Sequence, residues 1–445
     1  MSSQFPIIII GAGPIGLAMA AHLTHHQQDF LVFEAGETVG TSLQQWSHIK
    51  MFSSWALNID TIATELLKKN NWQEPNMSDF PTGQDMIDAY LKPLSEIPSI
   101  QNKIRYSHKV VQVSRFNQSK YQNRQSETPF EVTVTLPDGQ AQIIYARGVV
   151  DASGTWQTPN PIGGNGYTAI GEGKNNNIVY GIPDVLSKDK KRYINNDTVV
   201  VGSGHSAINV ILNLLKIHES NPAMRITWLY RANQTIQSEQ GCRPSLLPER
   251  NNLNNSINQA VKLNKLRVLD SFYISEIINT DFGKTFIKGL RYNAVSKIEC
   301  DQIIACTGSQ PDLNFIKELQ ISMDHQYESP KGVANLINEA KKTGEAIPQP
   351  HGYTALQHPE PDFFIIGSKS HGRAPNFFLM SGFEQVRSIA SYFSGDIKAA
   401  QEIKFSYPDD GICGSGCGDG GCCGTATEQS GQTSTASKSA VSCCS

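Results

Sequence analysis

The strongest constraint on this sequence is a strand–glycine turn–helix unit that occurs twice, first near residue 7 and again near residue 197. In the first unit the apolar run Ile7–Ile10 leads into Gly11-Ala-Gly13-Pro14-Ile-Gly16, and an apolar-rich stretch follows. Gly11 permits a tight turn, Gly13 lets the backbone approach a pyrophosphate, and Gly16 lets helix and strand pack closely. The start of the helix adds free N–H groups and a positive dipole end. The unit therefore predicts a dinucleotide site.

An acidic residue supports this interpretation. A second apolar strand, 30–33, ends on Glu34, eighteen residues beyond Gly16. At this spacing a carboxylate accepts hydrogen bonds from the adenosine ribose hydroxyls. The alternative is a glycine turn that only joins a strand to a helix.

The second unit follows the same logic. The strand 197–201 runs into a glycine turn and a helix, and Ala207 stands where a third glycine is usual, a replacement that the motif allows. The next strand ends on Arg231, where an NAD site would have an acid; a cation there suits a 2′-phosphate, which favours NADPH. A solvated charge at a strand end is the alternative for Arg231. The candidate nucleotide-binding residues of this turn are Gly202, Ser203, Gly204, His205 and Ser206.

Size and composition limit the other possibilities. A chain of 445 residues exceeds the usual size of one domain, and its net charge of -3 gives no reason to expect nucleic acid. No apolar run is long enough for a membrane span, and Ile7–Ile10 is too short for a signal peptide. Three cysteines lie singly in the body, Cys242, Cys300 and Cys306, which together with the missing export signal favours the cytoplasm.

Three further segments carry a resemblance to a known family. They are 149–159, with Asp151-Ala-Ser-Gly154; 300–312, with Thr307-Gly308-Ser-Gln-Pro-Asp; and 363–367, Phe-Phe-Ile-Ile-Gly367. With both glycine turns they resemble the two-dinucleotide-binding-domain flavoproteins, especially the flavin-containing monooxygenase-like and thioredoxin-reductase-like branches. The resemblance implies a resident FAD and an NADPH that comes and goes. The segment after Gly367 also resembles a bacterial subgroup that is associated in part with arsenic resistance.

The expected fold is α/β, with two Rossmann-type, three-layer ββα domains. The FAD domain comprises residues 1–160 and 299–405, and the NADPH domain, 161–298, is inserted in it; a disordered, Cys-rich tail covers 406–445. Within the first part, strands at 130–135 and 142–145 flank a turn and predict a hairpin. A helix is expected from Gln84 to about Leu91, ended by Pro93.

The resemblance implies further contacts to FAD. The loop after the ribose-binding strand would lie along the pyrophosphate and flavin, with Trp46 against the ring system or, equally, filling the core. The remaining FAD contacts would come from the two segments that connect the domains and from the loop after the last strand of the FAD domain. These candidate FAD-binding residues are Gly40, Thr41, Ser42, Trp46, Gly154, Thr307, Gly308 and Gly367.

The sequence also departs from these relatives. The body has no CxxC pair beside the flavin, and the monooxygenase motif F-x-G-x-x-x-H is missing before the second turn. Ser368-Lys369 replaces the Gly-Asp pair of many relatives, so recognition of the ribityl chain must differ. The reaction is therefore less constrained than the fold.

Few catalytic side chains are expected, because the flavin supplies the chemistry. The candidates are Arg373 and His371 after the last strand, and Asn58 in a loop that could line the substrate side of the flavin. Arg373, or Lys369, could stabilise an anionic reduced flavin or a peroxide. His205, at a helix N-terminus, is expected to be neutral. Solvent exposure without a role is the alternative for His371, Arg373 and Lys369.

The end of the chain is rich in glycine, serine and cysteine. Flexible thiols suit a soft ion such as Cu(I), Zn(II) or trivalent arsenic, although no standard zinc-finger spacing occurs. Alternatively Cys443-Cys444 could relay electrons from the flavin, or the tail could have no direct role. The candidate metal ligands are Cys413, Cys417, Cys422, Cys423, Cys443 and Cys444.

The preferred functional hypothesis is an NADPH-dependent flavin monooxygenase that oxygenates a small, soft or electron-rich substrate through a flavin C4a-peroxide. The first alternative is a flavin-dependent reductase that passes electrons to a thiol, disulfide or metalloid through the C-terminal cysteines. The second is a metal- or metalloid-binding flavoprotein. A homodimer is compatible with each, and the sequence does not specify the substrate.

Overall fold

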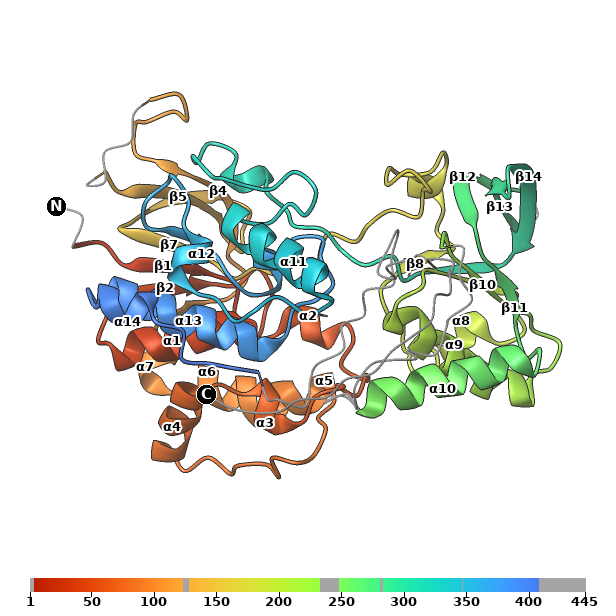
Figure 1. Cartoon of the computed structure of the whole chain (residues 1–445), viewed down its shortest axis with the longest axis horizontal. Helices are drawn as coiled ribbons and strands as arrows, with labels where there is room; N and C mark the ends of the chain where they lie inside the picture. Colours follow the sequence, from red (N-terminus) through yellow and green to blue (C-terminus); the bar gives the residue numbers. More distant parts are fainter. Residues whose placement is uncertain (1–3, 123–127, 233–247, 281–282, 346, 408–445) are drawn as a thin grey trace, which may run out of the picture.

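The computed structural model describes residues 4–122, 128–232, 248–280, 283–345 and 347–407. Its framework consists of two parallel five-stranded sheets, with the orders β16-β7-β1-β2-β3 and β11-β10-β9-β15-β8, which lie in separate halves of the molecule (Figure 1). The strands of the first sheet are β1 (Ile7–Ile10), β2 (Phe30–Phe33), β3 (Ile104–Arg105), β7 (Gly148–Asp151) and β16 (Phe363–Ile365). Those of the second are β8 (Ile178–Tyr180), β9 (Thr198–Val201), β10 (Ile226–Leu229), β11 (Arg267–Leu269) and β15 (Gln302–Ala305).

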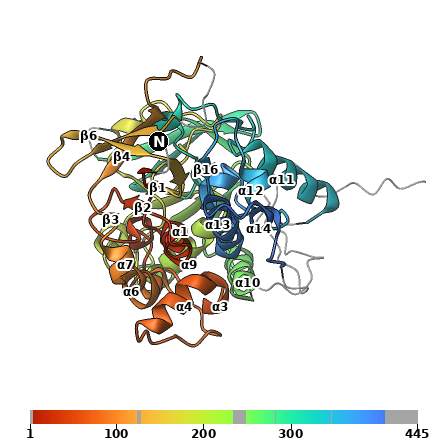
Figure 2. The ribbon, with the colours of Figure 1, turned by 90° about the vertical axis from the view of Figure 1, so that its left-hand side faces the viewer.

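Each parallel sheet is covered on one face by a three-stranded antiparallel sheet. The first cover is β4 (Lys109–Arg115), β5 (Phe130–Thr135) and β6 (Ala141–Ala146), and the second is β12 (Phe272–Asn279), β13 (Thr285–Arg291) and β14 (Ala294–Cys300). The predicted hairpin is confirmed by the antiparallel pairing of β5 with β6. Figure 2 shows β4 and β6 on one side of β1 and β2, and α1 (Pro14–His25) on the other.

Helices cover the opposite faces. In the first half these are α1 with α2 (Thr41–Gln44), α3 (Trp55–Asn58), α4 (Thr61–Lys69), α5 (Gly83–Asp85), α6 (Lys92–Ser95), α7 (Pro98–Gln101), α11 (Lys331–Thr343), α12 (Tyr353–Leu356), α13 (Leu379–Phe393) and α14 (Ile397–Gln401). The second half has α8 (Lys190–Tyr193), α9 (His205–Ser220) and α10 (Pro248–Lys262). Short turns η2 (Met86–Leu91), η3 (Glu172–Lys174), η4 (Asn314–Ile316) and η5 (Gly367–His371) complete the described elements. The three-layer ββα architecture expected from the sequence is thereby confirmed.

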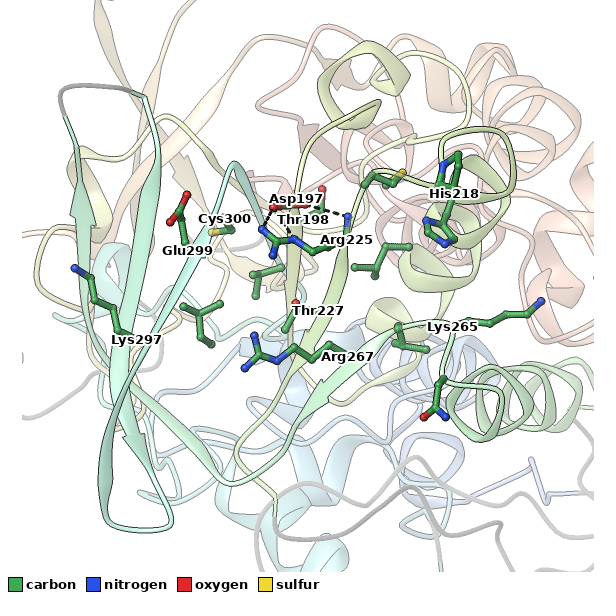
Figure 3. A pocket seen from close by; sticks show the side chains of 17 residues that line it. Asp197, Thr198, His218, Arg225, Thr227, Lys265, Arg267, Lys297, Glu299 and Cys300 are labelled. Carbon is green, nitrogen blue, oxygen red and sulfur yellow. Dashed lines mark hydrogen bonds and ion pairs between the residues drawn. The ribbon is translucent and has the colours of Figure 1, made fainter.

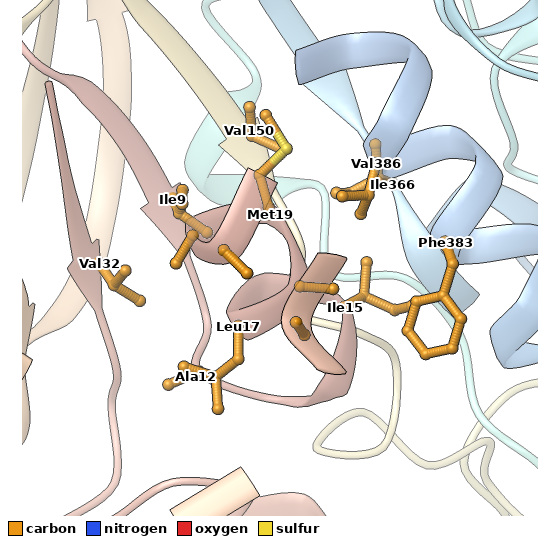
Figure 4. Close-up of a cluster of buried hydrophobic side chains, with 14 of the residues drawn as sticks. Ile9, Ala12, Ile15, Leu17, Met19, Val32, Val150, Ile366, Phe383 and Val386 are labelled. Atoms are coloured by element: carbon orange, nitrogen blue, oxygen red, sulfur yellow. The ribbon is translucent and has the colours of Figure 1, made fainter. Parts of the chain in front are cut away.

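The core of the first half lies between the sheet and its helices. Ile9 and Val150 from the sheet belong to the same buried cluster as Leu17 of α1 and Val386 of α13, and all four side chains are fully buried (Figure 4). Each such burial contributes about 1.5–3 kcal/mol of transfer free energy. The β-branched run Ile7–Ile10 forms a strand buried on both faces, as parallel sheets require.

The chain order makes the second sheet an insertion. Strands β8 to β15 all fall between β7 and β16, which pair with each other in the first sheet. Strand β15 pairs with β8 and β9 in the second sheet. We therefore propose that the inserted domain extends to about residue 305, beyond the expected limit of 298.

The helix expected to end at Pro93 instead continues to Ser95. Residues Met86–Leu91 form a π-helical turn, and the N–H of Lys92 donates to the carbonyl of Ile87, five residues earlier. Pro93 then occupies the first turn of α6, where a missing N–H is tolerated. Within the described residues, no helix is both long and apolar enough to cross a membrane.

Candidate functional site

The first glycine turn is built as a cradle at the carboxyl end of β1. Gly11 has φ +100°, and a Cβ there would lie 2.9 Å from the carbonyl oxygen of Ala152. A Cβ on Gly16 would lie 1.9 Å from the carbonyl oxygen of Gly11, so helix and turn touch at this point. Beside Gly13, in contrast, a Cβ would meet no atom within 4 Å. This open space, next to Pro14 at the start of α1, fits a pyrophosphate.

Glu34 stands at the rim of the same cradle. Its carboxylate accepts hydrogen bonds from the backbone N–H groups of Ala12 (2.7 Å) and Gly36 (2.8 Å). These bonds fix the carboxylate beside the turn and leave it further lone pairs, which fits the proposed role as acceptor for ribose hydroxyls. The loop that follows is held close as well, since the N–H of Gly40 donates to the carbonyl of Ala12 (3.1 Å).

The start of α2 links this loop to the crossing segment. Gly40 has φ +65°, and Thr41 and Ser42 form the first turn of α2. The hydroxyl of Ser42 accepts a hydrogen bond from Gln157 (3.3 Å). Trp46 packs against both large core clusters, and its ring lies 6.2 Å from that of Trp156. Trp46 thus contributes to the contact between the two halves of the molecule.

The second glycine turn repeats the geometry of the first at the carboxyl end of β9. Gly202 has φ +126°, and a Cβ there would lie 2.2 Å from the carbonyl oxygen of Cys306. A Cβ on Gly204 would again meet nothing within 4 Å. Helix α9 starts directly afterwards and buries Ala207 completely, which explains why a residue no larger than alanine stands there. Ser203 lies between the two glycines and Ser206 in the first turn of the helix. This second cradle fits the pyrophosphate of a nicotinamide nucleotide.

His205 lies at the start of α9. Burial and the nearby charge of Arg250 lower its pKa to about 4, so the imidazole is neutral at pH 7. Its ring meets the edge of Phe52 at 5.4 Å, and the guanidinium of Arg250 lies 5.6 Å from the centre of the same phenyl ring. Phe52, from the first half, thereby contacts the second nucleotide turn. Arg231 follows β10 with an exposed side chain.

The two crossings between the halves run side by side. Pro159 and Ser309 form an antiparallel bridge, and the side chain of Asn160 donates to the carbonyl of Thr307 (3.1 Å). Gly154 and Gly308 both have positive φ, +71° and +76°, which glycine adopts without strain.

The loop after β16 rests on a buried polar network. The side-chain oxygen of Gln385 accepts from the N–H of Gly367 (2.8 Å), and its amide donates to Ser370 (2.9 Å) and to Nε2 of His351 (2.9 Å). Beside it, the ammonium of Lys369 pairs with Asp151 (2.6 Å), and both side chains are fully buried. These contacts, from Gln385 of α13 and Asp151 of β7, hold Gly367 and η5 in position.

The three catalytic candidates do not converge. His371 is fully buried, hydrogen-bonds through Nδ1 to Asn376 (3.0 Å), and burial lowers its pKa to about 3. Asn58 is also buried, and its amide donates to the carbonyl of Ser53 (2.8 Å). Arg373 is partly exposed, pairs with Glu328 (2.7 Å), and borders a cavity of about 610 Å³ at the crossings. Arg373 alone of these three lies beside a described cavity.

The thiols in the described part of the body are inert. Burial raises the pKa of Cys300 and of Cys306 to about 12. Thiolate, the reactive form, is therefore scarce at neutral pH. Among the described residues, no group of His, Cys, Asp or Glu is arranged to hold a metal ion. Cys242 and the six tail cysteines lie outside the described residues.

Two of these features were not found from the sequence. Gln385 had no visible signal, because a glutamine in an amphipathic helix is ordinary; only the approach of α13 to the loop gives it a role. Phe52 lies six residues before Asn58, and its contact with His205 joins residues 153 positions apart. Such pairs leave no trace in local spacing.

Two nucleotide cradles, each between a parallel sheet and its helix, define a flavoprotein oxidoreductase that uses a nicotinamide nucleotide. The chain belongs to the pyridine nucleotide-disulphide oxidoreductase family, whose profile matches residues 8–332. This confirms the class inferred from the motifs, an FAD-dependent enzyme with NAD(P)H as its partner cofactor.

The sequence identity between this chain and individual relatives is low. The chain is 24% identical over 330 residues to the bacilliredoxin reductase Bdr of Bacillus subtilis, covering 74% of this chain and 84% of that protein. Among solved structures, the bacillithiol disulfide reductase Bdr of Bacillus cereus matches with a TM-score of 0.64 and 22% identity, covering 88% of this chain and 99% of that one. The cadaverine monooxygenase DfoA of Erwinia amylovora, solved with FAD, matches with a TM-score of 0.59 and 13% identity over 91% of this chain and 98% of that one. Both solved structures have the same fold as this chain.

Proposed function

We propose that this protein is an NADPH-dependent flavin reductase of disulfides, in which one NADPH and one proton convert a disulfide into two thiols and NADP⁺. The observation that carries the proposal is the similarity to Bdr along 74% of this chain and 84% of that protein. We therefore prefer the first alternative inferred from the sequence to the monooxygenase.

The protein's own groups bind and orient the two nucleotides. Gly13 and Gly204 admit the pyrophosphates, Glu34 holds the FAD ribose, and Arg231 pairs with the 2′-phosphate of NADPH. The neutral His205 lies beside the second pyrophosphate as a hydrogen-bonding group and adds no charge there. Bound FAD would supply the redox chemistry, which is the transfer of one electron pair from NADPH to the acceptor.

The acceptor must bring its own sulfur atoms to the flavin. Cys300 and Cys306 are buried thiols with raised pKa values, so neither can relay electrons. Two sources of a disulfide are compatible with this proposal: a small substrate, for which the bacillithiol disulfide of the Bdr structures is the precedent, and Cys443-Cys444 near the end of this sequence.

Arg373 is the side chain that we assign to acceptor binding. Its guanidinium borders the cavity of about 610 Å³ beside Gln310 and Tyr180. Its partner Glu328 offsets part of the charge, and an acceptor carboxylate would compete with that partner for the guanidinium. His371 and Asn58, both buried, are assigned to positioning the loops that carry them.

A second candidate function is the monooxygenase, in which NADPH, a proton and oxygen convert a substrate into its oxygenated form, with NADP⁺ and water. The observation in its favour is the same burial of Cys300 and Cys306, because this reaction needs no thiol. The metalloid-binding alternative depends wholly on tail residues outside the described part of the chain.

The test is anaerobic reduction of the FAD-loaded protein with NADPH, followed by mixing with cystine or with oxygen. The proposal expects rapid reoxidation by cystine with two thiols formed per NADPH, and slow reoxidation by oxygen. Cys443→Ser and Cys444→Ser variants show whether the tail takes part. If cystine does not reoxidise the protein, and oxygen together with an added electron-rich substrate yields the oxygenated substrate in place of hydrogen peroxide, the monooxygenase replaces the reductase.

A further inference from the structure

A second cavity lies at the edge of the second sheet that faces away from the nucleotide turn. It has a volume of about 500 Å³ and is bordered by the first residues of β9, β10 and β11 and by the last residues of β14. We call it the amino-edge pocket. The parallel strands place it opposite Gly202, which follows the carboxyl end of β9. At about 3.3 Å per residue, a four-residue strand separates the two edges by roughly 13 Å.

The lining of the amino-edge pocket is richer in cations than in anions. It includes Arg225, Arg267, Lys265 and Lys297, against Asp197 and Glu299, whereas the whole chain has a net charge of -3. A volume of this size suits a small ligand. The local excess of positive charge in a slightly acidic protein therefore favours an anion.

The carboxylate of Asp197 is already hydrogen-bonded to another residue of this lining. It accepts from Nε of Arg225 (2.9 Å) and from the backbone N–H of the same residue (3.0 Å). The arginine hydrogen bonds lower the pKa of Asp197, which keeps the carboxylate charged. Arg225 and Asp197 thus neutralise each other and form one wall of the pocket (Figure 3).

Arg267, in contrast, has no such partner among the described residues. Arg267 is exposed, and its guanidinium makes no hydrogen bond or ion pair with any residue in the described ranges. It extends from the start of β11 toward β14, near the buried Thr227 (Figure 3). Lys265 and Lys297 point away from this centre. A guanidinium presents planar, paired N–H donors that match the oxygen atoms of a carboxylate or phosphate.

A buried polar atom elsewhere in the lining also supports the binding of a ligand in this pocket. His218, in the last turn of α9, lines the pocket, and its Nδ1 is buried without a hydrogen-bond partner among the described residues. Buried polar atoms usually have a partner, whether protein, water or ligand.

We propose that the amino-edge pocket binds a small polyanion, with a carboxylate or phosphate group held by Arg267 and Thr227. The site is separate from both nucleotide cradles and requires no particular acceptor for the flavin. It gives the enzyme a place where an anionic metabolite can bind without displacing NADPH.

The experiment is isothermal titration of the FAD-loaded, full-length protein with inorganic phosphate and, separately, with citrate. Saturating NADP⁺ is present, so that anion binding beside Arg231 does not contribute, and ionic strength is matched with potassium chloride. The variants are Arg267→Gln and Arg267→Lys, with Lys216→Ala, an exposed cation of α9 outside the pocket, as the control.

The expected result is saturable binding of at least one anion, weakened about tenfold or more by Arg267→Gln and unchanged by Lys216→Ala, because a charge-assisted hydrogen bond contributes roughly 1.5–3 kcal/mol. Phosphate and citrate separately show which chemistry the site prefers. Arg267→Lys keeps the charge but loses the paired donors, so it should bind with intermediate affinity. No saturable binding, or binding that survives Arg267→Gln, would overturn the proposal.

Discussion

Gly204→Ala should weaken NADPH binding without disturbing the protein. The backbone of Gly204 has φ −81° and ψ 173°, which alanine adopts freely, and a Cβ there meets no atom within 4 Å. The added methyl group therefore enters only the space assigned to the pyrophosphate. Since Gly204 caps α9, the change also costs about 1 kcal/mol or less of helix stability.

The magnitude follows from one compromised phosphate contact. If the methyl group prevents one charge-assisted hydrogen bond, binding loses roughly 1.5–3 kcal/mol, so the Kd for NADPH rises about 10- to 150-fold. The assay is anaerobic stopped-flow reduction of the flavin at increasing NADPH concentration, with FAD content measured from the absorbance spectrum. FAD content should equal that of the wild type.

Gly202→Ala is the matched comparison, two residues away. Its φ of +126° is unfavourable for alanine, and the new Cβ would lie 2.2 Å from the carbonyl oxygen of Cys306. This variant should lose roughly 2 kcal/mol or more of stability, seen as a lower Tm. An unchanged NADPH dependence in Gly204→Ala, with Gly202→Ala as stable as the wild type, would refute the assignment of this turn.

Three further predictions concern other parts of the structure. Gln385→Ala should weaken FAD binding, because it leaves the N–H of Gly367 without its acceptor; the Kd for FAD, measured by flavin fluorescence, should rise while NADPH still reduces the bound fraction. Glu360→Gln should cost about 3–5 kcal/mol in guanidinium unfolding, because the Arg115–Glu360 pair is almost wholly buried; a loss below about 1 kcal/mol would contradict this. Finally, burial lowers the pKa of His205 below its usual value to about 4, so the unfolded chain binds more protons between pH 6.5 and 4. Stability should fall as pH drops through that window, and a His205→Gln variant should show a smaller fall in its Tm.

The parts of the fold that the sequence predicted are those with local causes. Each glycine turn depends on residues within its own strand–turn–helix unit, and Glu34 directly follows the strand after the first unit, so short-range spacing was sufficient to locate them. The helix before Pro93 shows the limit of such reasoning. Proline usually ends a helix, but here a π-helical turn precedes Pro93, which falls in the first turn of the next helical segment, where its missing N–H is tolerated.

The parts that could not be predicted join distant residues. Lys369 was considered as a group that stabilises reduced flavin, but it is fully buried in an ion pair with Asp151, 218 positions earlier in the chain. Its charge is therefore largely balanced inside the protein before any ligand binds. A lysine in a loop gives no sign of such a partner, because β7 and β16 become neighbours only when the first sheet forms.

The burial of the described thiols has the widest consequence for function. A disulfide reductase with an internal relay needs thiols that are accessible and have a low pKa, yet burial raises the pKa of Cys300 and Cys306 instead. Both residues lie at the ends of strands in the second half, where they pack as small apolar groups. The electron pair must therefore leave the flavin for a group outside the described body, and the identity of that group decides between the two candidate reactions. If Arg373 binds the acceptor, as we propose, substitution of Arg373 should change which acceptors reoxidise the protein and leave its reduction by NADPH unchanged.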